Sequence, residues 1–283
     1  MTRPDGRPLA LALLLLGVAA PAGAQLRRDP AVPHASAARA GELLLGAGFG
    51  WDGDRSFPLS GLRGNLLRVG TLTVAYAVAD GVLLEVRGDA WHVLRIHGRE
   101  PSHVPLASGV ADGTTTDAGD FRIATVARLV GGATGPSAGV DVAVKLPNSQ
   151  QSRGIGLNTT DFEGSAFGSW GGERVRVTGE LGIGILTAPL RTFIQDDVLL
   201  YGAELLWDPD GGAGGLPRMA IGVRGRANTR HVVPVGLEDQ GTASVGLDWE
   251  RGGWLVDGSV LAGYAADSPD FGVRVGIARR LRL

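Results

Sequence analysis

The chain has 283 residues, a formal net charge of −2 at pH 7 and no cysteine. The near-neutral charge gives no reason to expect a nucleic-acid partner, and the lack of cysteine excludes a disulfide scaffold. Glycine is abundant, at 46 residues, and the length suits one large β domain better than two small ones.

The N-terminus predicts export from the cytoplasm. Two arginines precede an apolar run over 9–20, and Ala22-Gly23-Ala24 offers a small-residue cleavage site. This is the layout of a secretory signal peptide, so residues 1–24 are expected to be removed. Residues 25–40 show no hydrophobic periodicity and are expected to form a flexible lead. No later stretch has the roughly 18–20 apolar residues of a membrane-spanning helix, so a mature chain in a membrane would cross it as strands.

Alternation of apolar and polar residues dominates the chain after residue 40. In 138–146 every second residue is apolar, while Asp141 and Lys145 fall on the opposite phase. Successive side chains of a strand point to opposite faces, so such a segment has one apolar and one charged face. In a soluble sheet the apolar face would be buried in a core. In a transmembrane barrel it would face lipid, and the polar face would line the lumen.

Strand-like segments follow one another through the rest of the chain. In order, they cover 41–51, 66–78, 82–96, 121–130, 138–146, 160–170, 175–185, 199–207, 218–226, 243–250, 254–264 and 271–283. In the second segment the alternation allows two outward-facing sets of side chains. One set includes Val69 and Thr71, and the other includes Leu72. In the third segment Leu84 and Leu94 are expected to share the apolar face.

The connections alternate in length. Those at Asp80, Gly131, Gly171, Gly211 and Gly252 are short and glycine-rich. Those beginning at Asp52, Gly98, Asn148, Pro189 and His231 are longer and more polar. Short periplasmic turns and long external loops produce this rhythm in outer-membrane barrels.

These patterns predict an all-β fold, a closed antiparallel transmembrane β-barrel of about twelve strands over 41–283. We expect it in a bacterial outer membrane with both mature termini periplasmic, and with membrane lipid and the outer-membrane assembly machinery as partners. A secreted soluble β-sandwich is the alternative fold. The oligomeric state is left open.

The polar phase of the strands predicts which side chains line the lumen. They are Arg122, Arg128, Asp141, Lys145, Asp161, Arg174, Arg176, Glu180, Glu204, Arg224, Arg226, Asp248, Asp257 and Arg274. They could pair across strands and close a narrow lumen, because buried charge is costly unless it is paired. Alternatively they could form a polar constriction that guides a solute.

No residue pattern predicts catalysis, a cofactor or a metal. His97 and His103 fit no standard metal-ligand spacing. Ser137 is the centre of a Gly-x-Ser-x-Gly sequence at 135–139, but a strand-like segment follows it in place of the helix of a nucleophile elbow. The glycines are expected in turns, because no helix follows them to bind a phosphate. We therefore expect a protein that is not an enzyme.

Two stretches carry a resemblance to a known family. One comprises Val144-Lys145-Leu146-Pro147 and, further on, Thr159-Thr160-Asp161-Phe162. The other is Ser268-Pro269-Asp270-Phe271 with the strand that follows. Together they resemble the outer-membrane proteins grouped with the meta-pathway phenol-degradation transporter. Asn148, where that family usually has Thr, and the terminal Leu283 in place of an aromatic residue depart from its pattern.

The resemblance implies an outer-membrane channel for passive passage of small, hydrophobic or aromatic solutes. The alternative function is an occluded barrel with a binding or structural role, in which the loops 98–119 and 148–158 do the work. Both functions require the same alternation of residues, so the sequence leaves the choice open.

Overall fold

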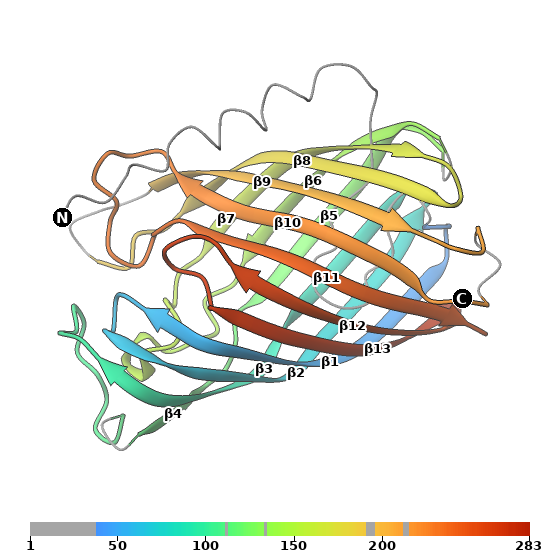
Figure 1. Ribbon diagram of the computed structural model, residues 1–283. Helices are drawn as coiled ribbons and strands as arrows, with labels where there is room; N and C mark the ends of the chain where they lie inside the picture. Colours follow the sequence, from blue (N-terminus) through green and yellow to red (C-terminus); the bar gives the residue numbers. More distant parts are fainter. Residues whose placement is uncertain (1–37, 111–112, 133–134, 191–195, 212–214) are drawn as a thin grey trace, which may run out of the picture.

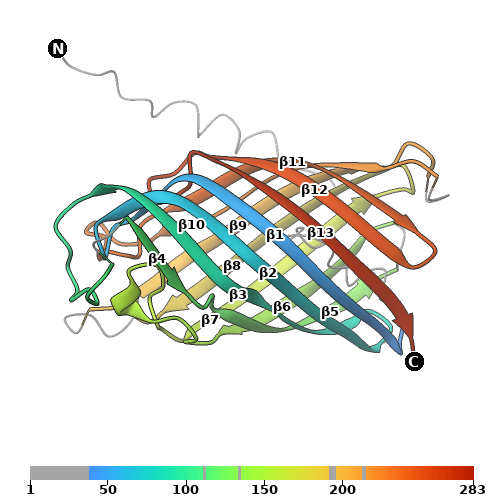
Figure 2. The same cartoon turned by 90° about the horizontal axis from the view of Figure 1, so that it is seen from below.

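The computed structural model describes residues 38–110, 113–132, 135–190, 196–211 and 215–283. The predicted signal peptide and nearly all of the predicted lead lie outside these residues. The described chain forms one antiparallel sheet that closes on itself as a barrel (Figures 1 and 2). No helix in the described ranges is long and apolar enough to cross a membrane.

The strands are long and follow one another with few other elements. They are β1 (Glu42–Phe57), β2 (Leu62–Ala79), β3 (Val82–Arg99), β4 (Thr114–Asp117), β5 (Phe121–Gly131), β6 (Ser137–Lys145), β7 (Asp161–Gly171), β8 (Val175–Leu186), β9 (Asp196–Trp207), β10 (Arg218–Asn228), β11 (Gln240–Arg251), β12 (Trp254–Gly263) and β13 (Phe271–Arg282). One short 3-10 helix, η2 (Gln151–Arg153), lies between β6 and β7.

Closure comes from β1, which pairs with β2 on one side and β13 on the other. The strand β3 pairs with β2 on one edge, and its other edge is shared by two strands. Val82–Gly88 of β3 pairs with β5, and His92–Arg95 pairs with the four-residue β4. Since β4 and β5 occupy one place in the wall, the barrel has twelve strands, which confirms the predicted fold and strand number.

The two ends of the barrel differ. The turns β2–β3, β7–β8 and β11–β12 lie at the end where the C-terminus is, which we call the turn end. The connections β1–β2, β3–β4 and β12–β13 lie at the opposite end, the loop end (Figure 1). Gly252 and Gly253 have φ values of 58° and 76°, so the two-residue turn between β11 and β12 depends on backbone angles that favour glycine.

The outer surface of the barrel is apolar. Val142 is 58% exposed, whereas its neighbour Asp141 is 2% exposed, and the same alternation recurs along the other strands. In water, apolar surface costs about 25 cal/mol per Å². Such a surface is favourable in contact with the hydrocarbon core of a membrane. Hydrocarbon offers no hydrogen-bond partners to an open sheet edge, so a sheet in a membrane has to close into a barrel. The fold is that of a transmembrane β-barrel, and the soluble sandwich is wrong.

A bulge against β1 explains the open phase of β2. Gly48 pairs with Thr71 and Phe49 pairs with Val69, so Gly70 is an extra residue in β2. Gly70 adopts a φ of 65°, and the alternation inverts there. Val69 and Leu72 are therefore both exposed, while Thr71 is buried.

The same inversion corrects the prediction for β3. Leu84 is 46% exposed, as expected for the outer face, but Leu94 is fully buried at 0%. Leu94 lies beyond Ala90 and packs with loop residues Val110 and Ile155 at the loop end. The prediction that Leu84 and Leu94 share a face was wrong because it assumed unbroken alternation.

The predicted loop over 52–65 was also wrong for most of its length. In the structure β1 continues to Phe57 and β2 begins at Leu62. The polar and glycine residues of this stretch suggested a loop. Many of them instead continue the two strands toward the loop end.

Apolar side chains fill the interior at the turn end. They come from strands on several sides of the barrel and form one buried cluster, which we call the turn-end cluster: Ala38, Leu44, Ala75, Ala77, Leu83, Val126, Phe167, Leu255 and Ala278. Its largest side chain is Phe167, on β7. The ring lies over Gly139 of β6, where an added Cβ would lie 2.4 Å from its Cζ atom, so glycine makes room for the ring.

Candidate functional site in the barrel interior

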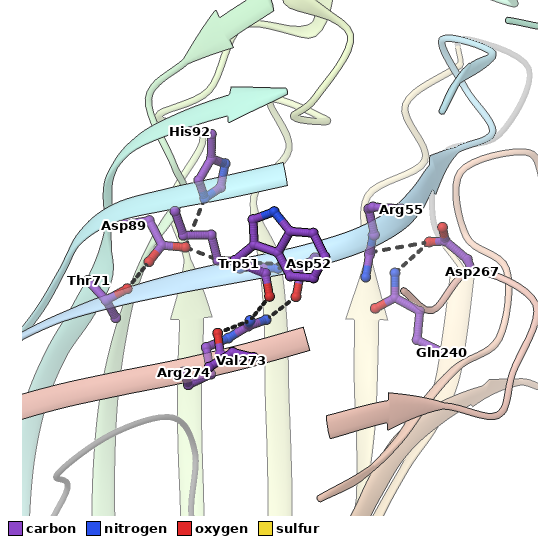
Figure 3. Close-up of polar contacts among 11 residues, drawn as sticks. Trp51, Asp52, Arg55, Thr71, Asp89, His92, Gln240, Asp267, Val273 and Arg274 are labelled. Atoms are coloured by element: carbon purple, nitrogen blue, oxygen red, sulfur yellow. Dashed lines mark hydrogen bonds and ion pairs between the residues drawn. The ribbon is translucent and has the colours of Figure 1, made fainter. Parts of the chain in front are cut away.

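The middle of the interior is held by buried ion pairs. Asp52 of β1 is 0% exposed and accepts from two arginines on the flanking strands (Figure 3). An Nη2–Oδ2 distance of 2.9 Å joins it to Arg68 of β2, and an Nη2–Oδ1 distance of 2.5 Å joins it to Arg274 of β13. Alternation along β1 turns Asp52 inward, while Trp51 packs its ring against Phe271 at 4.9 Å.

Asp89 extends this network along β3. Its carboxylate accepts from Arg68 at 3.1 Å and from the Thr71 hydroxyl at 2.5 Å. The Nε2 atom of His92 lies 2.8 Å from Asp89 Oδ2, the oxygen that also accepts from Arg68 (Figure 3). Four strands are thus tied together through two carboxylates, with the desolvation of each charge offset by a close partner.

Two further clusters lie on the adjoining strands β5, β6 and β7. Arg122 of β5 donates to Asp141 at 3.0 Å and to Glu163 at 2.9 Å. Lys145 of β6 lies 3.2 Å from Asp161 and also reaches Asp120 at 3.0 Å. The Arg122–Asp141 and Lys145–Asp161 contacts join neighbouring strands, and the Arg122–Glu163 contact reaches across β6. All of these side chains share one face of the sheet, where such pairs are expected.

Most of the predicted lumen residues point away from the outer surface. The buried ones are Asp141, Asp161, Glu204, Asp248, Asp257 and Arg274. The half-buried ones are Arg122, Arg128, Lys145, Arg176, Glu180, Arg224 and Arg226. The exception is Arg174, which is exposed in the turn before β8, because that strand begins only at Val175. For Arg174 the prediction needs correction.

The structure brings only part of that set together around open space. Arg122, Glu180, Arg224, Arg226 and Arg274 line one cavity, and Lys145, Asp161 and again Arg226 line another. Five cavity or network residues were not predicted from the sequence: Asp52, Arg55, Arg68, Asp89 and Glu163. The first two lay in the supposed loop and Arg68 beside the bulge. Asp89 and Glu163 could have been predicted, because both lie on the polar phase of their strand segments.

The cavity nearer the loop end, which we call the outer cavity, has a volume of about 340 Å³. Its charged lining is mixed, with Arg55, Arg68, Lys145 and Arg226 against Asp89, Asp120, Asp161, Glu163 and Asp267. The rest is largely apolar and comes from loops and strand ends, including Leu59, Val104, Ile155, Leu157, Leu186 and Leu200.

The second cavity, the inner cavity, has a volume of about 370 Å³ and a different charge. Arginines dominate its lining, which contains Arg55, Arg68, Arg87, Arg122, Arg224, Arg226 and Arg274. The carboxylates among its lining residues are Glu163 and Glu180. Acidic residues such as Asp52 and Asp141 lie behind the arginines in the wall, so the guanidinium groups are what the cavity presents.

The two cavities adjoin. Six residues line both of them, and we call these residues the junction: Arg55, Arg68, Glu163, Leu200, Arg226 and Gln240. None of the lining residues of either cavity belongs to the turn-end cluster. A path from the loop end would therefore pass a mixed vestibule, an arginine-rich junction and inner cavity, and then an apolar section.

Asp267 stands beside the junction, in the loop between β12 and β13. Its Oδ2 atom accepts from Gln240 at 2.5 Å and lies 3.8 Å from the guanidinium of Arg55 (Figure 3). Burial raises the pKa of the Asp267 carboxyl above its ordinary value, although Arg55, Gln240 and Arg226 act in the opposite direction. Desolvation of the charged form therefore outweighs its partners here.

The described residues contain no group of three or more His, Asp or Glu side chains placed to hold a metal ion. The Nε2 atom of His92 contacts Asp89, and among the described residues His92 forms no hydrogen bond with a serine hydroxyl. What this arrangement can do is present fixed charges and apolar surface to a molecule inside the barrel.

No protein-family model matches the sequence, and no curated protein is matched by it. Solved structures do resemble the fold. The COG4313 outer membrane channel from Pseudomonas putida F1 superposes with a TM-score of 0.60 at 14% identity, over 91% of this chain and 100% of that one. The NanC porin superposes with a TM-score of 0.52 at 8% identity, over 84% of this chain and 100% of that one. The chain thus has the barrel fold of outer-membrane channels.

Proposed function

We propose that the protein is a channel of the bacterial outer membrane through which small solutes pass without energy coupling. The observation that carries this proposal is the pair of adjoining cavities with charged linings inside a closed barrel whose outer surface is apolar. A barrel that served only as a membrane anchor could fill this space with side chains. The solved channels that share the fold agree with such a role.

The proposed orientation follows from the loop lengths. Short turns are periplasmic in outer-membrane barrels and long loops are external, so both ends of the mature chain would be periplasmic. The outer cavity would then open toward the outside and the turn-end cluster would lie toward the periplasm. Membrane lipid and the outer-membrane assembly machinery are the partners that this location requires.

The resemblance to the meta-pathway phenol-degradation transporter suggests a hydrophobic or aromatic solute. The apolar side chains of the outer cavity, such as Ile155 and Leu157, support a solute with an apolar body. Each cavity also has the volume of a typical small-molecule site, which is about 300–1,000 Å³.

A second candidate function is an occluded barrel that binds a ligand without passing it. The turn-end cluster favours this candidate, because buried apolar side chains across the interior would leave no continuous water path. The two candidates agree on the cavities and differ only at the turn end.

Conductance across a planar bilayer separates them. The purified, full mature chain is first checked for the heat-dependent shift in gel migration that a folded barrel shows. We expect discrete conductance steps, and uptake of a small aromatic solute by liposomes that contain the protein. Folded protein with neither conductance nor uptake would refute the channel and favour the occluded barrel.

A further inference from the structure

Two arginines at the junction of the cavities lack the partners that the other buried arginines have. The first is Arg55 of β1, whose Nε atom is buried without a hydrogen-bond partner. In the described part of the chain its only ion pair is the long one to Asp267, at 3.8 Å, and its guanidinium donates no hydrogen bond. Its other neighbour is the ring of Phe57, with the guanidinium carbon 5.9 Å from the ring centroid.

The second is Arg226 of β10. Its Nε atom donates one long hydrogen bond, of 3.4 Å, to the backbone carbonyl of Glu238. Among the described residues no carboxylate lies within ion-pair distance of it. Arg226 is also close enough to Arg55 for the two like charges to repel each other.

Arg68, which lines the same junction, shows what a satisfied arginine looks like here. It donates to Asp52 through both Nε and Nη2, at 3.0 and 2.9 Å, and reaches Asp89 through Nη1. A guanidinium has five donors, and each buried donor without a partner costs about 1–3 kcal/mol. The barrel therefore keeps two incompletely satisfied arginines in the lining that the two cavities share, at the point where a solute would pass between them.

The acidic groups that face this pair each have another partner, including Asp267, which forms the long ion pair with Arg55. Glu163 accepts from Arg122 and Asp161 pairs with Lys145. Glu238 accepts from the backbone N–H of Gly236, and Asp267 from Gln240. An external anion would be the missing partner, and the arginines of the inner cavity would add to its attraction.

We infer that Arg55 and Arg226 form a binding site for the carboxylate of a small organic anion with an apolar body. A planar carboxylate matches the two-pronged guanidinium, which binds it through paired N–H groups. The apolar residues of the outer cavity, among them Leu59 and Leu200, would contact the body of the anion. Its passage through the site rests on the proposed channel function, whereas its binding does not.

The test measures ion selectivity and block in planar bilayers. In a KCl gradient the reversal potential should show that chloride passes more readily than potassium. Benzoate should reduce the chloride current at a concentration about ten times lower than its neutral analogue benzyl alcohol, the difference of about 1.4 kcal/mol expected for one charge-assisted contact. Arg226→Gln and Arg55→Gln should each remove most of this preference for benzoate.

Arg218→Gln is the matched control. Arg218 lies on the same strand as Arg226 but pairs with Asp248 and lines neither cavity. It should leave both selectivity and block unchanged. A channel that selects cations, or that responds equally to benzoate in the native protein and in Arg226→Gln, would overturn the inference while leaving the channel function intact.

If the folded protein does not conduct, titration calorimetry in detergent micelles still decides the matter. Binding of benzoate that is weakened in Arg226→Gln but kept in Arg218→Gln would support the anion site in an occluded barrel. Absence of benzoate binding by the folded native protein would overturn it. The failure of the channel and the failure of the site thus give different results.

Discussion

The middle and the turn end of the barrel interior are built from different kinds of side chain. In the middle, arginines such as Arg68 and Arg274 surround open cavities and are held by buried acids. At the turn end Phe167 and its apolar neighbours pack as they would in the core of a soluble protein. In the proposed channel the two sections would have different roles. Charged side chains can discriminate among solutes only where the interior is open, and a barrier to water needs apolar packing.

The turn-end cluster should be the section that limits flow. Phe167→Ala removes a side chain that is 4% exposed and should increase single-channel conductance several-fold. The lost packing should also cost about 3–5 kcal/mol of unfolding free energy. Phe162→Ala, on the same strand but 52% exposed on the outer face, is the control and should leave conductance unchanged. Equal conductance in native protein and Phe167→Ala would show that the cluster is not the barrier.

The middle section should depend on its buried acids for stability. Asp52→Asn leaves Arg68 and Arg274 without the carboxylate that both contact and should lower the unfolding free energy by about 3 kcal/mol. The measurement is the urea midpoint of the barrel in detergent micelles. Asp54→Asn removes the partner of Arg63, which is 53% exposed, and should cost less than about 1 kcal/mol. Similar losses in the two variants would contradict the role assigned to the buried network.

The smallest effect should be the pH dependence of stability and anion selectivity that Asp267 causes at the edge of the middle section. Burial raises the pKa of Asp267 above 3.8, so this carboxyl holds its proton to a higher pH in the folded barrel than in the unfolded chain. Its contribution to stability is greatest below 3.8 and is lost as pH rises through the raised value. Over the same rise the carboxylate becomes charged beside Arg55, so anion selectivity should fall.

Asp267→Asn should remove that dependence. Reversal potentials measured from pH 3.8 upward should show constant anion selectivity in the variant and declining selectivity in the native protein. The variant should be no less stable than the native protein near neutral pH, because the ionised carboxylate is disfavoured by burial. An unchanged pH profile in Asp267→Asn would mean that another group controls selectivity.

The sequence by itself determined the kind of fold. Alternation such as that of Asp141 and Val142 assigns opposite faces within a strand, and long apolar faces on nearly every strand are compatible with a barrel in lipid. The number of strands and the two kinds of connection also followed from local patterns. These features depend on residues near one another in the chain, so a sequence pattern carries them.

Only the tertiary structure decided which charges meet and where the interior is open. The bulge at Gly70 lies in the pairing of β2 with β1, and the faces of β2 and β3 invert at Gly70 and Ala90, which hides Leu94. Asp52 becomes a hub because β1 closes the barrel against β13, which places Arg274 beside it from 222 residues further along the chain. The incomplete bonding of Arg55 and Arg226 is likewise a property of the assembled barrel. Contacts of this kind depend on the register and closure of the sheet, and alternation along single strands carries no information about them.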